Sequence, residues 1–305
     1  MQEQHLNQSI MDRRQFVKTA TLAAAVWGMG TKAAITAESS KNRSFLNGKP
    51  RIKLGTVTYN LAQDWDIDTI IKNCTAAKFD GVELRTSHKH GVEVTLTKEQ
   101  RDVVRKKFQN SQVELMGLGS TFDYHTPDQQ KLRKDIEATK EYIILAHDVG
   151  ASGVKVRPNG FPKEVSQEKT LEQIGKSLRE LGDFAKDHGQ VIRLEAHGSG
   201  TQFLPHIKTI MDVANHPSVG VCWNSNPTDL DGAGFDANFN LVKDKIIAVH
   251  MRDLCLEDYP FRKLLTRLNE IGFTGYTLAE IGPSTDPVQL MKYYRALWLA
   301  YQGLL

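Results

Sequence analysis

Four short apolar segments in the second half of the chain each end on a side chain that can bind a metal ion. They read VIRLE (191–195), VGVCWN (219–224), IIAVH (246–250) and YTLAE (276–280). Apolar runs of this length, separated by helical stretches, are typical of buried parallel strands. The carboxyl ends of such strands gather on one rim of a closed barrel. We therefore expect the terminal residues to meet there: Glu195, Asn224, His250 and Glu280.

Four earlier segments complete a set of eight predicted strands, at 52–58, 81–85, 112–118 and 153–157. Helical stretches lie between strands, for example at 67–78, 128–147, 171–187 and 261–271, and several end on glycine: Gly150, Gly189 and Gly272. Eight strand–helix pairs predict an α/β fold, a (β/α)8 TIM barrel forming one domain over 51–305. A doubly wound open sheet is the alternative, but the loop at 56–61 lacks the glycines of its phosphate-binding turn.

The first 37 residues resemble a twin-arginine export signal. Arg13 and Arg14 precede Phe16, Lys18 and a weakly apolar run at 19–30. That run is shorter than the roughly 20 residues that span a bilayer, so we expect no stable membrane insertion once the signal is removed. The prediction is a periplasmic or otherwise exported protein, with cleavage between 33 and 37 and a polar linker over 38–50.

Charge and cysteine content exclude two other classes. The whole chain carries a net charge of +3, and residues 1–37 hold four basic and two acidic side chains, which leaves +1 for the rest. Nucleic-acid binding usually needs a concentrated basic face, so no nucleic-acid partner is expected. Three cysteines, none in a C-x-x-C pair, do not form a disulfide framework.

The alternation of side chains along a strand predicts opposite charges inside the mouth of the barrel. On three predicted strands, two charged residues share the inward face: Glu83 with Arg85, Lys155 with Arg157, and Arg193 with Glu195. Buried charges are costly unless they are paired. Such a cluster indicates either a polar ligand or a structural network of ion pairs under the rim, and both interpretations stay open here.

Four motifs around the strand ends make the resemblance to a family specific. They are LEAHG (194–198), CWNSNP (222–227), VHMRD (249–253) and AEIG (279–282). Together they resemble the metal site of the xylose-isomerase-like sugar isomerase/epimerase superfamily, over about residues 52–301. The resemblance implies one divalent ion, with manganese, magnesium or cobalt as candidates, held by Glu195, Asn224, His250 and Glu280. It also implies a sugar substrate and proton transfer by Glu195 and Glu280.

One position departs from the family pattern. Members often have aspartate where this chain has Asn224. An amide ligates through a neutral oxygen, so the predicted site has two carboxylates instead of three and would hold its ion less tightly. The alternatives are an ion with altered preference, drift away from isomerase chemistry, and a barrel that has lost its metal.

Other side chains on the same rim are candidate sugar contacts. His197 follows Glu195 on the same face, and Arg252 follows His250. An anionic or enediolate oxygen could be held by Lys155 and Arg157, although their pairing with Glu83 would be purely structural. The remaining candidates are loop residues with equally plausible structural roles: His88, His90, His125 and Trp65.

The predicted function is a divalent-metal-dependent sugar isomerase or epimerase that removes a proton next to a carbonyl and passes through an enediolate. A 3-keto-glycoside lyase, acting by β-elimination, shares that first step and is an open alternative. So is a non-catalytic sugar-binding barrel. Barrels of this family often pair, so a homodimer is a further expectation.

Overall fold

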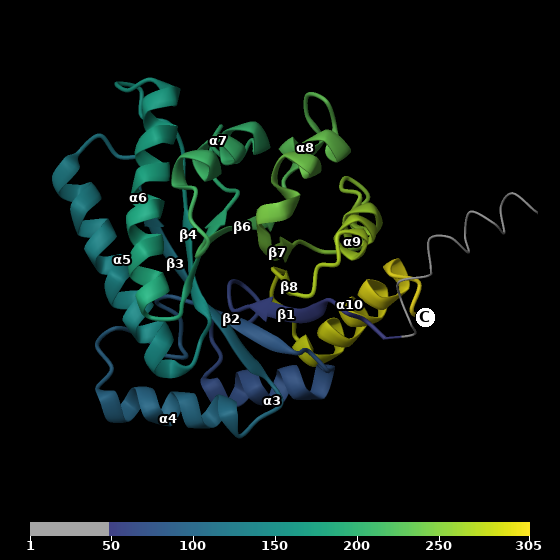
Figure 1. The fold of residues 1–305 in the computed structure, drawn as a ribbon. Helices are drawn as coiled ribbons and strands as arrows, with labels where there is room; N and C mark the ends of the chain where they lie inside the picture. Colours follow the sequence, from purple (N-terminus) through teal and green to yellow (C-terminus); the bar gives the residue numbers. More distant parts are fainter. Residues whose placement is uncertain (1–48) are drawn as a thin grey trace, which may run out of the picture. The chain divides into compact units, whose positions relative to one another are not determined.

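The computed structural model describes residues 49–305, so the predicted export signal (1–37) and almost all of the predicted linker (38–50) lie outside the described residues. Eight parallel strands close into a barrel in chain order, each hydrogen-bonded to the next and β8 to β1 (Figure 1). The predicted TIM barrel is confirmed. The strands are β1 (Lys53–Val57), β2 (Gly81–Arg85), β3 (Glu114–Asp123), β4 (Gly153–Arg157), β5 (Val191–Glu195), β6 (Val219–Asn224), β7 (Ile246–Met251) and β8 (Tyr276–Ala279).

Helices surround the strands as an outer ring (Figure 1). They are α3 (Ile67–Ala77), α4 (Lys98–Gln109), α5 (Gln129–Val149), α6 (Gln167–Asp187), α7 (Leu204–Ala214), α8 (Phe235–Val242), α9 (Phe261–Glu270) and α10 (Pro287–Tyr301), with 3-10 turns η1 (Pro227–Leu230) and η2 (Lys243–Lys245) flanking α8. In this described part of the chain, no helix has the length and apolar character required to cross a lipid bilayer.

Several helices begin where the sequence supplies a capping side chain. Asp66, Thr97, Asp128 and Ser166 each accept a hydrogen bond from a backbone N–H of the first turn that follows. Such a cap satisfies a donor that the helix itself cannot pair, and typically contributes about 1 kcal/mol. At the other end of α5, Gly150 adopts the left-handed conformation with φ of 81°, as its predicted role as a helix terminator requires.

The strand boundaries shift by one or two residues at β1, β7, β8 and the start of β3, and by five residues at the end of β3. β3 continues to Asp123 instead of ending at 118, and its register against β4 shifts between Gly119 and Asp123. The predicted end of this strand is wrong because an irregular extension has no simple alternation to read. β8 ends at Ala279, one residue before Glu280. The backbone N–H of Glu280 still donates to the Met251 carbonyl at 2.9 Å, which fixes this residue on the rim next to β7.

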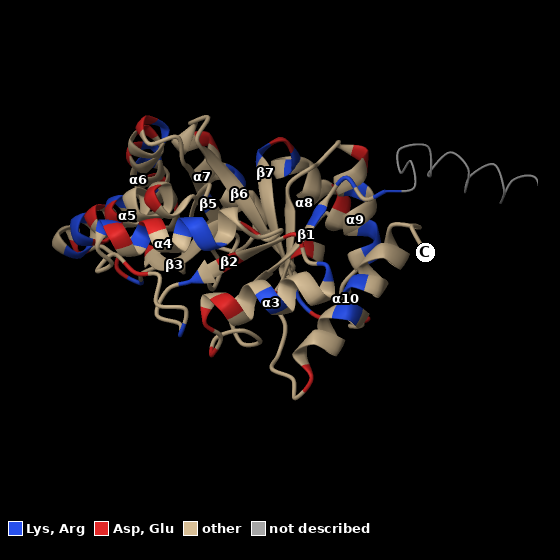
Figure 2. Ribbon diagram, turned by 90° about the horizontal axis from the view of Figure 1, so that it is seen from below, with Lys and Arg blue, Asp and Glu red and all other residues tan. Residues whose placement is uncertain are grey.

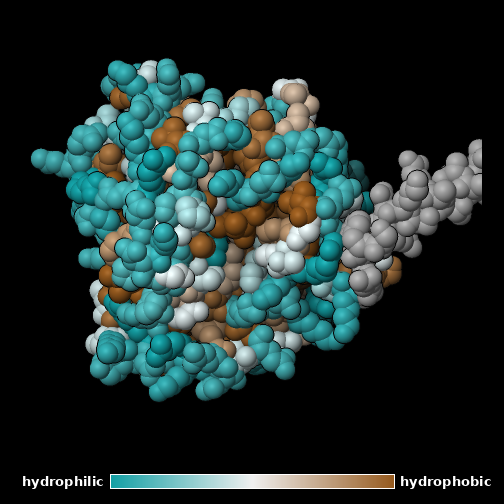
Figure 3. Space-filling model, in the orientation of Figure 1, coloured by the Kyte–Doolittle hydropathy of each residue, from teal (hydrophilic) through white to brown (hydrophobic). Residues whose placement is uncertain are grey.

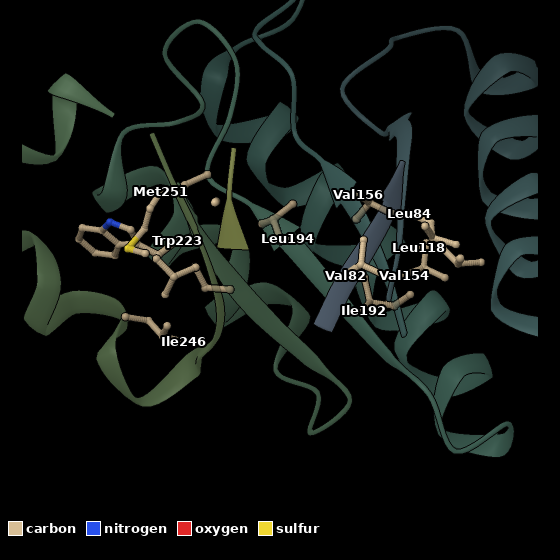
Figure 4. Close-up of a cluster of buried hydrophobic side chains, with 14 of the residues drawn as sticks. Val82, Leu84, Leu118, Val154, Val156, Ile192, Leu194, Trp223, Ile246 and Met251 are labelled. Carbon is tan, nitrogen blue, oxygen red and sulfur yellow. The ribbon is translucent and has the colours of Figure 1, made fainter. Parts of the chain in front are cut away.

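The alternation of each strand divides the apolar side chains into two layers. Outward-facing residues such as Val82, Val154 and Leu194 belong to the large core between barrel and helices (Figure 4). A smaller cluster fills the barrel itself: Val57, Met116, Cys222, Ala248, Tyr276 and Leu278. Trp223 packs outward against Phe235 and Phe239, whereas Cys222 faces inward, as the alternation predicted.

Charged residues lie mostly on the outside of the molecule. Lysine, arginine, aspartate and glutamate cover much of the outer helices and loops (Figure 2). From the side shown in Figure 3, hydrophilic residues form the periphery, and apolar ones gather toward the middle of the face. The charged side chains inside the barrel are therefore exceptions, and they define the site described below.

The loop after β6 is anchored by one buried carboxylate. Asp229 is completely buried, and its Oδ2 accepts hydrogen bonds from the Tyr259 hydroxyl at 2.5 Å and from the Asn226 N–H at 3.1 Å. Trp223 Nε1 in turn donates to the Tyr259 hydroxyl at 2.9 Å. Burial raises the pKa of Asp229 to about 8 in spite of the hydrogen bond that Tyr259 donates.

This pKa predicts how stability depends on pH. Asp229 titrates near 8 when folded and near 4 in an unfolded chain, so the folded state binds more protons between those values. Its contribution to stability is full below about pH 4 and is lost as pH rises toward 8, by up to about 1.4 kcal/mol per pH unit. Urea unfolding at pH 5 and pH 7.5 should therefore show a smaller pH-dependent loss in Asp229→Asn than in the parent. Asp231→Asn, which removes an exposed carboxylate nearby, is the control; equal pH dependence in all three proteins would contradict the prediction.

Candidate active site at the C-terminal rim

Three of the four predicted metal ligands converge at the carboxyl ends of their strands. Glu195 ends β5, His250 lies near the end of β7, and Glu280 follows β8; each offers a ligand atom, and these atoms lie within 4.8 Å of one another. His250 Nδ1 is 3.6 Å from Glu195 Oε1 and 3.7 Å from Glu280 Oε2. Two carboxylates and one imidazole at this spacing are a suitable donor set for a divalent transition ion.

A third carboxylate lies against the other nitrogen of the imidazole. Glu83, from β2, is completely buried, and its Oε1 lies 3.4 Å from His250 Nε2 on the side away from the glutamate pair. Gly119 makes room for it, since a Cβ at that position would come within 2.7 Å of Glu83 Oε1. Carboxylate–histidine pairs of this kind orient metal-binding imidazoles and select which nitrogen faces the ion.

Several buried polar atoms of this group have no hydrogen-bond partner. They are both ring nitrogens of His250 and both carboxylate oxygens of Glu83. Unpartnered buried polar groups are rare in folded proteins and call for an explanation such as an ion. The residues present therefore fit a divalent metal ion.

Asn224 reaches the same cluster through its amide. Its Nδ2 lies 3.4 Å from Glu195 Oε1 and 3.4 Å from Asn226 Oδ1, so the amide donates toward the glutamate. A half-turn of the amide would exchange nitrogen and oxygen and aim Oδ1 at the cluster instead. Asn226, which donates to the Ala196 carbonyl at 2.7 Å, ties this loop to the end of β5.

Lys155 occupies the floor of the cluster. Its Nζ donates to Glu195 Oε2 at 2.7 Å, and both side chains are almost entirely buried. Burial alone would raise the pKa of Glu195, but the charges of Lys155 and His250 hold that pKa well below its usual range. Glu195 is therefore ionised, and one of its oxygens is already committed to an ammonium group.

The pKa values of Glu280 and His250 are both raised, for different reasons. Burial raises the pKa of Glu280 above the ordinary value, although His250 opposes this. Burial opposes the charged form of His250, yet the neighbouring Cys222 and Glu83 raise its pKa well above the usual range. Two carboxylates whose environments move their pKa values apart are typical of acid–base sites.

A cavity of about 340 Å³ opens above the cluster. This volume lies at the lower end of the range for small-molecule pockets. Its walls come from β1, β5, β6, β7 and β8 and the loops that follow these strands: Tyr59, Asn60, Glu195, His197, Asn224, Ser225, Asn226, Pro227, Arg252 and Glu280.

Two predicted sugar contacts, His197 and Arg252, line this cavity. His197 has a buried Nδ1 without a hydrogen-bond partner, and burial lowers its pKa. Arg252 is held by the Ser225 carbonyl, to which its Nε donates at 3.0 Å, and by Asp258 at 3.3 Å. Both side chains can therefore present polar atoms to a ligand in the cavity.

The remaining candidates lie outside the cavity wall. Trp65 packs against the main core, and His125 Nδ1 lies 3.1 Å from Asp123 Oδ1. Arg157 donates to the Thr121 carbonyl at 3.4 Å. His88 Nδ1 is 3.0 Å from the Thr58 hydroxyl, and His90 Nε2 is 2.7 Å from the Arg85 carbonyl.

Some lining residues were missed by sequence reasoning. Tyr59 and Asn60 belong to the loop after β1, and Asn226 stands two residues past Asn224. The strand-end pattern gave no reason to select the first two. Asn226 could have been suspected, because it is a second amide inside the motif that carries Asn224.

Comparisons with solved structures agree with the barrel. A 3-keto-D-glucoside 4-epimerase from E. coli superimposes with a TM-score of 0.68 at 16% identity, covering 82% of this chain and 99% of that one. The IolI protein with a bound zinc atom gives 0.68 at 18% identity, covering 83% and 98%. An L-ribulose 3-epimerase gives 0.70 at 15% identity, covering 83% and 95%. At these identities the likeness shows the fold alone, and no curated protein matches the chain by sequence.

The comparison with family models is decisive for membership. The model described as a xylose isomerase-like TIM barrel matches residues 71–297, which is most of the chain and includes all four predicted metal ligands. This protein belongs to the xylose isomerase-like TIM barrel family.

Proposed function

We propose that this protein is a divalent-metal-dependent isomerase or epimerase of a sugar or keto-sugar, which acts by proton transfer next to a carbonyl. The observation that carries the proposal is the convergence of Glu195, His250 and Glu280, two of which, Glu195 and Glu280, line a rim cavity. Relatives described as epimerases of 3-keto-glucosides, psicose and ribulose share the barrel and support this class of reaction.

The metal would be held by Glu195, His250 and Glu280, with Asn224 as a fourth ligand after its amide turns. Glu83 would keep the imidazole in place from behind, because it faces the other ring nitrogen. A divalent ion bound there polarises a carbonyl and makes the neighbouring C–H more acidic.

Proton transfer falls to the two glutamates. Both line the cavity, and their side chains differ in exposure, 4% for Glu195 and 23% for Glu280. Glu280 is the more accessible, and burial raises its pKa, which makes its carboxylate the stronger base. We assign Glu280 to the first proton transfer. Glu195 is ionised, so it would make the second transfer with a proton that it first accepts from a substrate hydroxyl or from solvent.

Lys155 and the rim residues would orient the substrate and balance its charge. The ammonium of Lys155 is buried beside Glu195, which lines the cavity. It can stabilise the negative charge of an enediolate, because a preorganised cation in a dry site is most effective where charge develops. His197 and Arg252 line the cavity, where they would hold sugar hydroxyls.

Metal content tests the site directly. Protein loaded with Mn²⁺ or Co²⁺ and then desalted should hold about one ion per chain by elemental analysis, and Glu195→Ala should lose it because a charged ligand is removed. Glu83→Gln should weaken binding about 10- to 100-fold in calorimetry, as expected for a residue that orients a ligand. Glu172→Ala, an exposed glutamate on α6, is the matched control. Equal occupancy in the parent and Glu195→Ala would refute the proposed ligand set.

Solvent exchange tests the chemistry. The metal-loaded protein should incorporate deuterium from heavy water beside the carbonyl of at least one keto-sugar in a panel. Glu280→Gln should slow this exchange about 10²- to 10⁴-fold while sugar binding persists, because general acid–base groups contribute that much. Glu172→Gln should exchange at the parental rate. A parent that binds sugars in calorimetry but exchanges no proton would identify a non-catalytic sugar-binding barrel instead.

Product analysis separates the two catalytic alternatives. Given a 3-keto-glycoside, an isomerase or epimerase returns a product of identical mass with its aglycone attached. A lyase releases the aglycone, because β-elimination breaks the glycosidic bond. Mass spectrometry of the reaction should therefore show an isomer of unchanged mass, and metal-dependent release of the aglycone would favour the lyase.

A further inference from the structure

Two arginines at the barrel mouth lack acidic partners. Arg85 ends β2 and Arg157 ends β4, and both are partly buried. Within residues 49–305, neither guanidinium has a carboxylate oxygen within 4.0 Å, and they contact mainly carbonyl groups: Arg85 Nη1 donates to Thr86 O at 3.3 Å and Arg157 Nη2 to Thr121 O at 3.4 Å. Arg157 Nε is buried without a hydrogen-bond partner.

The sheet register places these arginines on the same side of the mouth. Arg85 is paired with Gly119 on β3, and Gly119 is paired with Lys155 on β4. Two strand spacings separate Arg85 from Lys155, which is roughly 10 Å between Cα atoms. Arg157 lies two residues beyond Lys155 and shares its inward face. Gly119, between them on β3, leaves room for the Glu83 carboxylate, and Asp123 of the same strand is level with Arg157.

Both guanidinium groups lie directly behind residues that line the cavity. The Arg85 guanidinium carbon is 5.2 Å from the centre of the Tyr59 ring, and its Nη1 is 3.4 Å from His88 Nε2. Arg157 lies two residues beyond Lys155, whose Nζ contacts Glu195, and the backbone of Asn159 that follows packs against Gly198, the neighbour of His197. Tyr59 and His197 are wall residues of the cavity. The two arginines therefore stand next to wall residues of the cavity, at the ends of β2 and β4, without lining the cavity themselves.

The acidic residue nearest to Arg157 in the sheet has other partners. Asp123 pairs with Arg157 in the backbone register, but its side chain contacts His125 at 3.1 Å, Lys131 at 3.8 Å and Asn159 at 3.1 Å. Arg157 thus has no internal anion to neutralise it, although one lies on the adjacent strand.

The balance of charges at the barrel mouth also favours an anionic ligand. Three carboxylates (Glu83, Glu195 and Glu280) face three permanent cations (Arg85, Lys155 and Arg157) at the mouth, whereas Arg193 lies deeper in the barrel, where it donates to Ser152 Oγ at 2.7 Å. A bound divalent ion would add two more positive charges. A metal-loaded mouth therefore has an excess of positive charge that a neutral sugar would leave uncompensated.

We infer that the substrate carries an anionic group, a carboxylate or a phosphate, which Arg85 and Arg157 bind while the reacting carbonyl lies over the metal cluster. The inference rests on the proposed function and narrows its substrate class to acidic sugars. Planar guanidinium forks match the geometry of carboxylate and phosphate oxygens, and each pairing is a charge-assisted hydrogen bond. We therefore expect acidic keto-sugars to be better substrates than neutral ketoses with the same carbon skeleton.

Matched substrates provide the test. D-fructose, D-fructuronate and D-fructose 6-phosphate share the keto group and differ at C6. With the metal-loaded full chain, solvent exchange should show kcat/KM at least about 10-fold higher for one anionic member than for D-fructose, and this preference should shrink as salt rises. The Arg85→Gln/Arg157→Gln double variant should lose the preference mainly through KM, and Arg85→Lys/Arg157→Lys should retain part of it. Arg133→Gln, which removes a guanidinium from the outer face of α5, should keep it in full.

Calorimetry with D-glucuronate, D-glucose 6-phosphate and D-glucose supplies a readout that does not require turnover, and thermal unfolding confirms that each variant is folded. A preference for the carboxylate or the phosphate member identifies which anion is bound and supports the inference. Equal exchange of fructose and its anionic partners overturns the inference and leaves the proposed function intact. If no compound exchanges, the proposed function fails, and the anion site is judged from binding alone. Tighter binding of glucuronate or glucose 6-phosphate than of glucose, lost in the double variant, supports the anion site. Equal binding of all three compounds overturns it.

Discussion

The whole site depends on how His250 is held inside the barrel. Its Nε2 faces Glu83, its Nδ1 faces Glu195 and Glu280, and all of these groups except Glu280 are almost completely buried. Burying charged groups is expensive, and it is tolerated only where each has a partner. Lys155 supplies a hydrogen bond to Glu195, but Glu83 and both nitrogens of His250 make no hydrogen bond and meet their charged neighbours only at 3.4 to 3.7 Å. Stability alone gives no reason to keep these buried groups without hydrogen bonds. A bound ligand that pairs with them would explain their presence.

Asn224, at a position where the family resemblance led us to expect aspartate, is consistent with this charge balance. An additional carboxylate beside Glu195 would place like charges against each other, whereas the amide donates toward Glu195 at 3.4 Å. Lys155 further reduces the negative charge that Glu195 offers to an ion. A metal held by fewer effective negative charges is bound less tightly and withdraws more electron density from its substrate. In this chain weaker metal binding and stronger carbonyl activation would have the same origin.

The fold and the position of the site were accessible from sequence because both rest on simple periodicity. Apolar strands of five or six residues, followed by helices, predicted the barrel, and period-two alternation placed Cys222 inside it and Trp223 outside. The location of Glu83 beneath His250 could not be predicted, because it depends on barrel closure between β2 and β7 and on the room left by Gly119. The end of β3, Tyr59 and Asn60 were missed for a related reason: loops and irregular strand ends follow tertiary packing instead of a repeat.

The mouth of the barrel is chemically asymmetric, and that asymmetry is the most informative feature about the ligand. The ends of β5, β7 and β8 carry the donors that could hold a metal ion. The ends of β2 and β4 carry Arg85 and Arg157, whose guanidinium groups have no acidic partner among the described residues. A barrel rim can vary each strand end independently, so the chemistry of one side does not fix the specificity of the other. Metal-assisted proton transfer would then depend on the β5–β8 side of the cavity. The choice of substrate would be decided across the cavity, where two arginines favour an anion over a neutral hydroxyl.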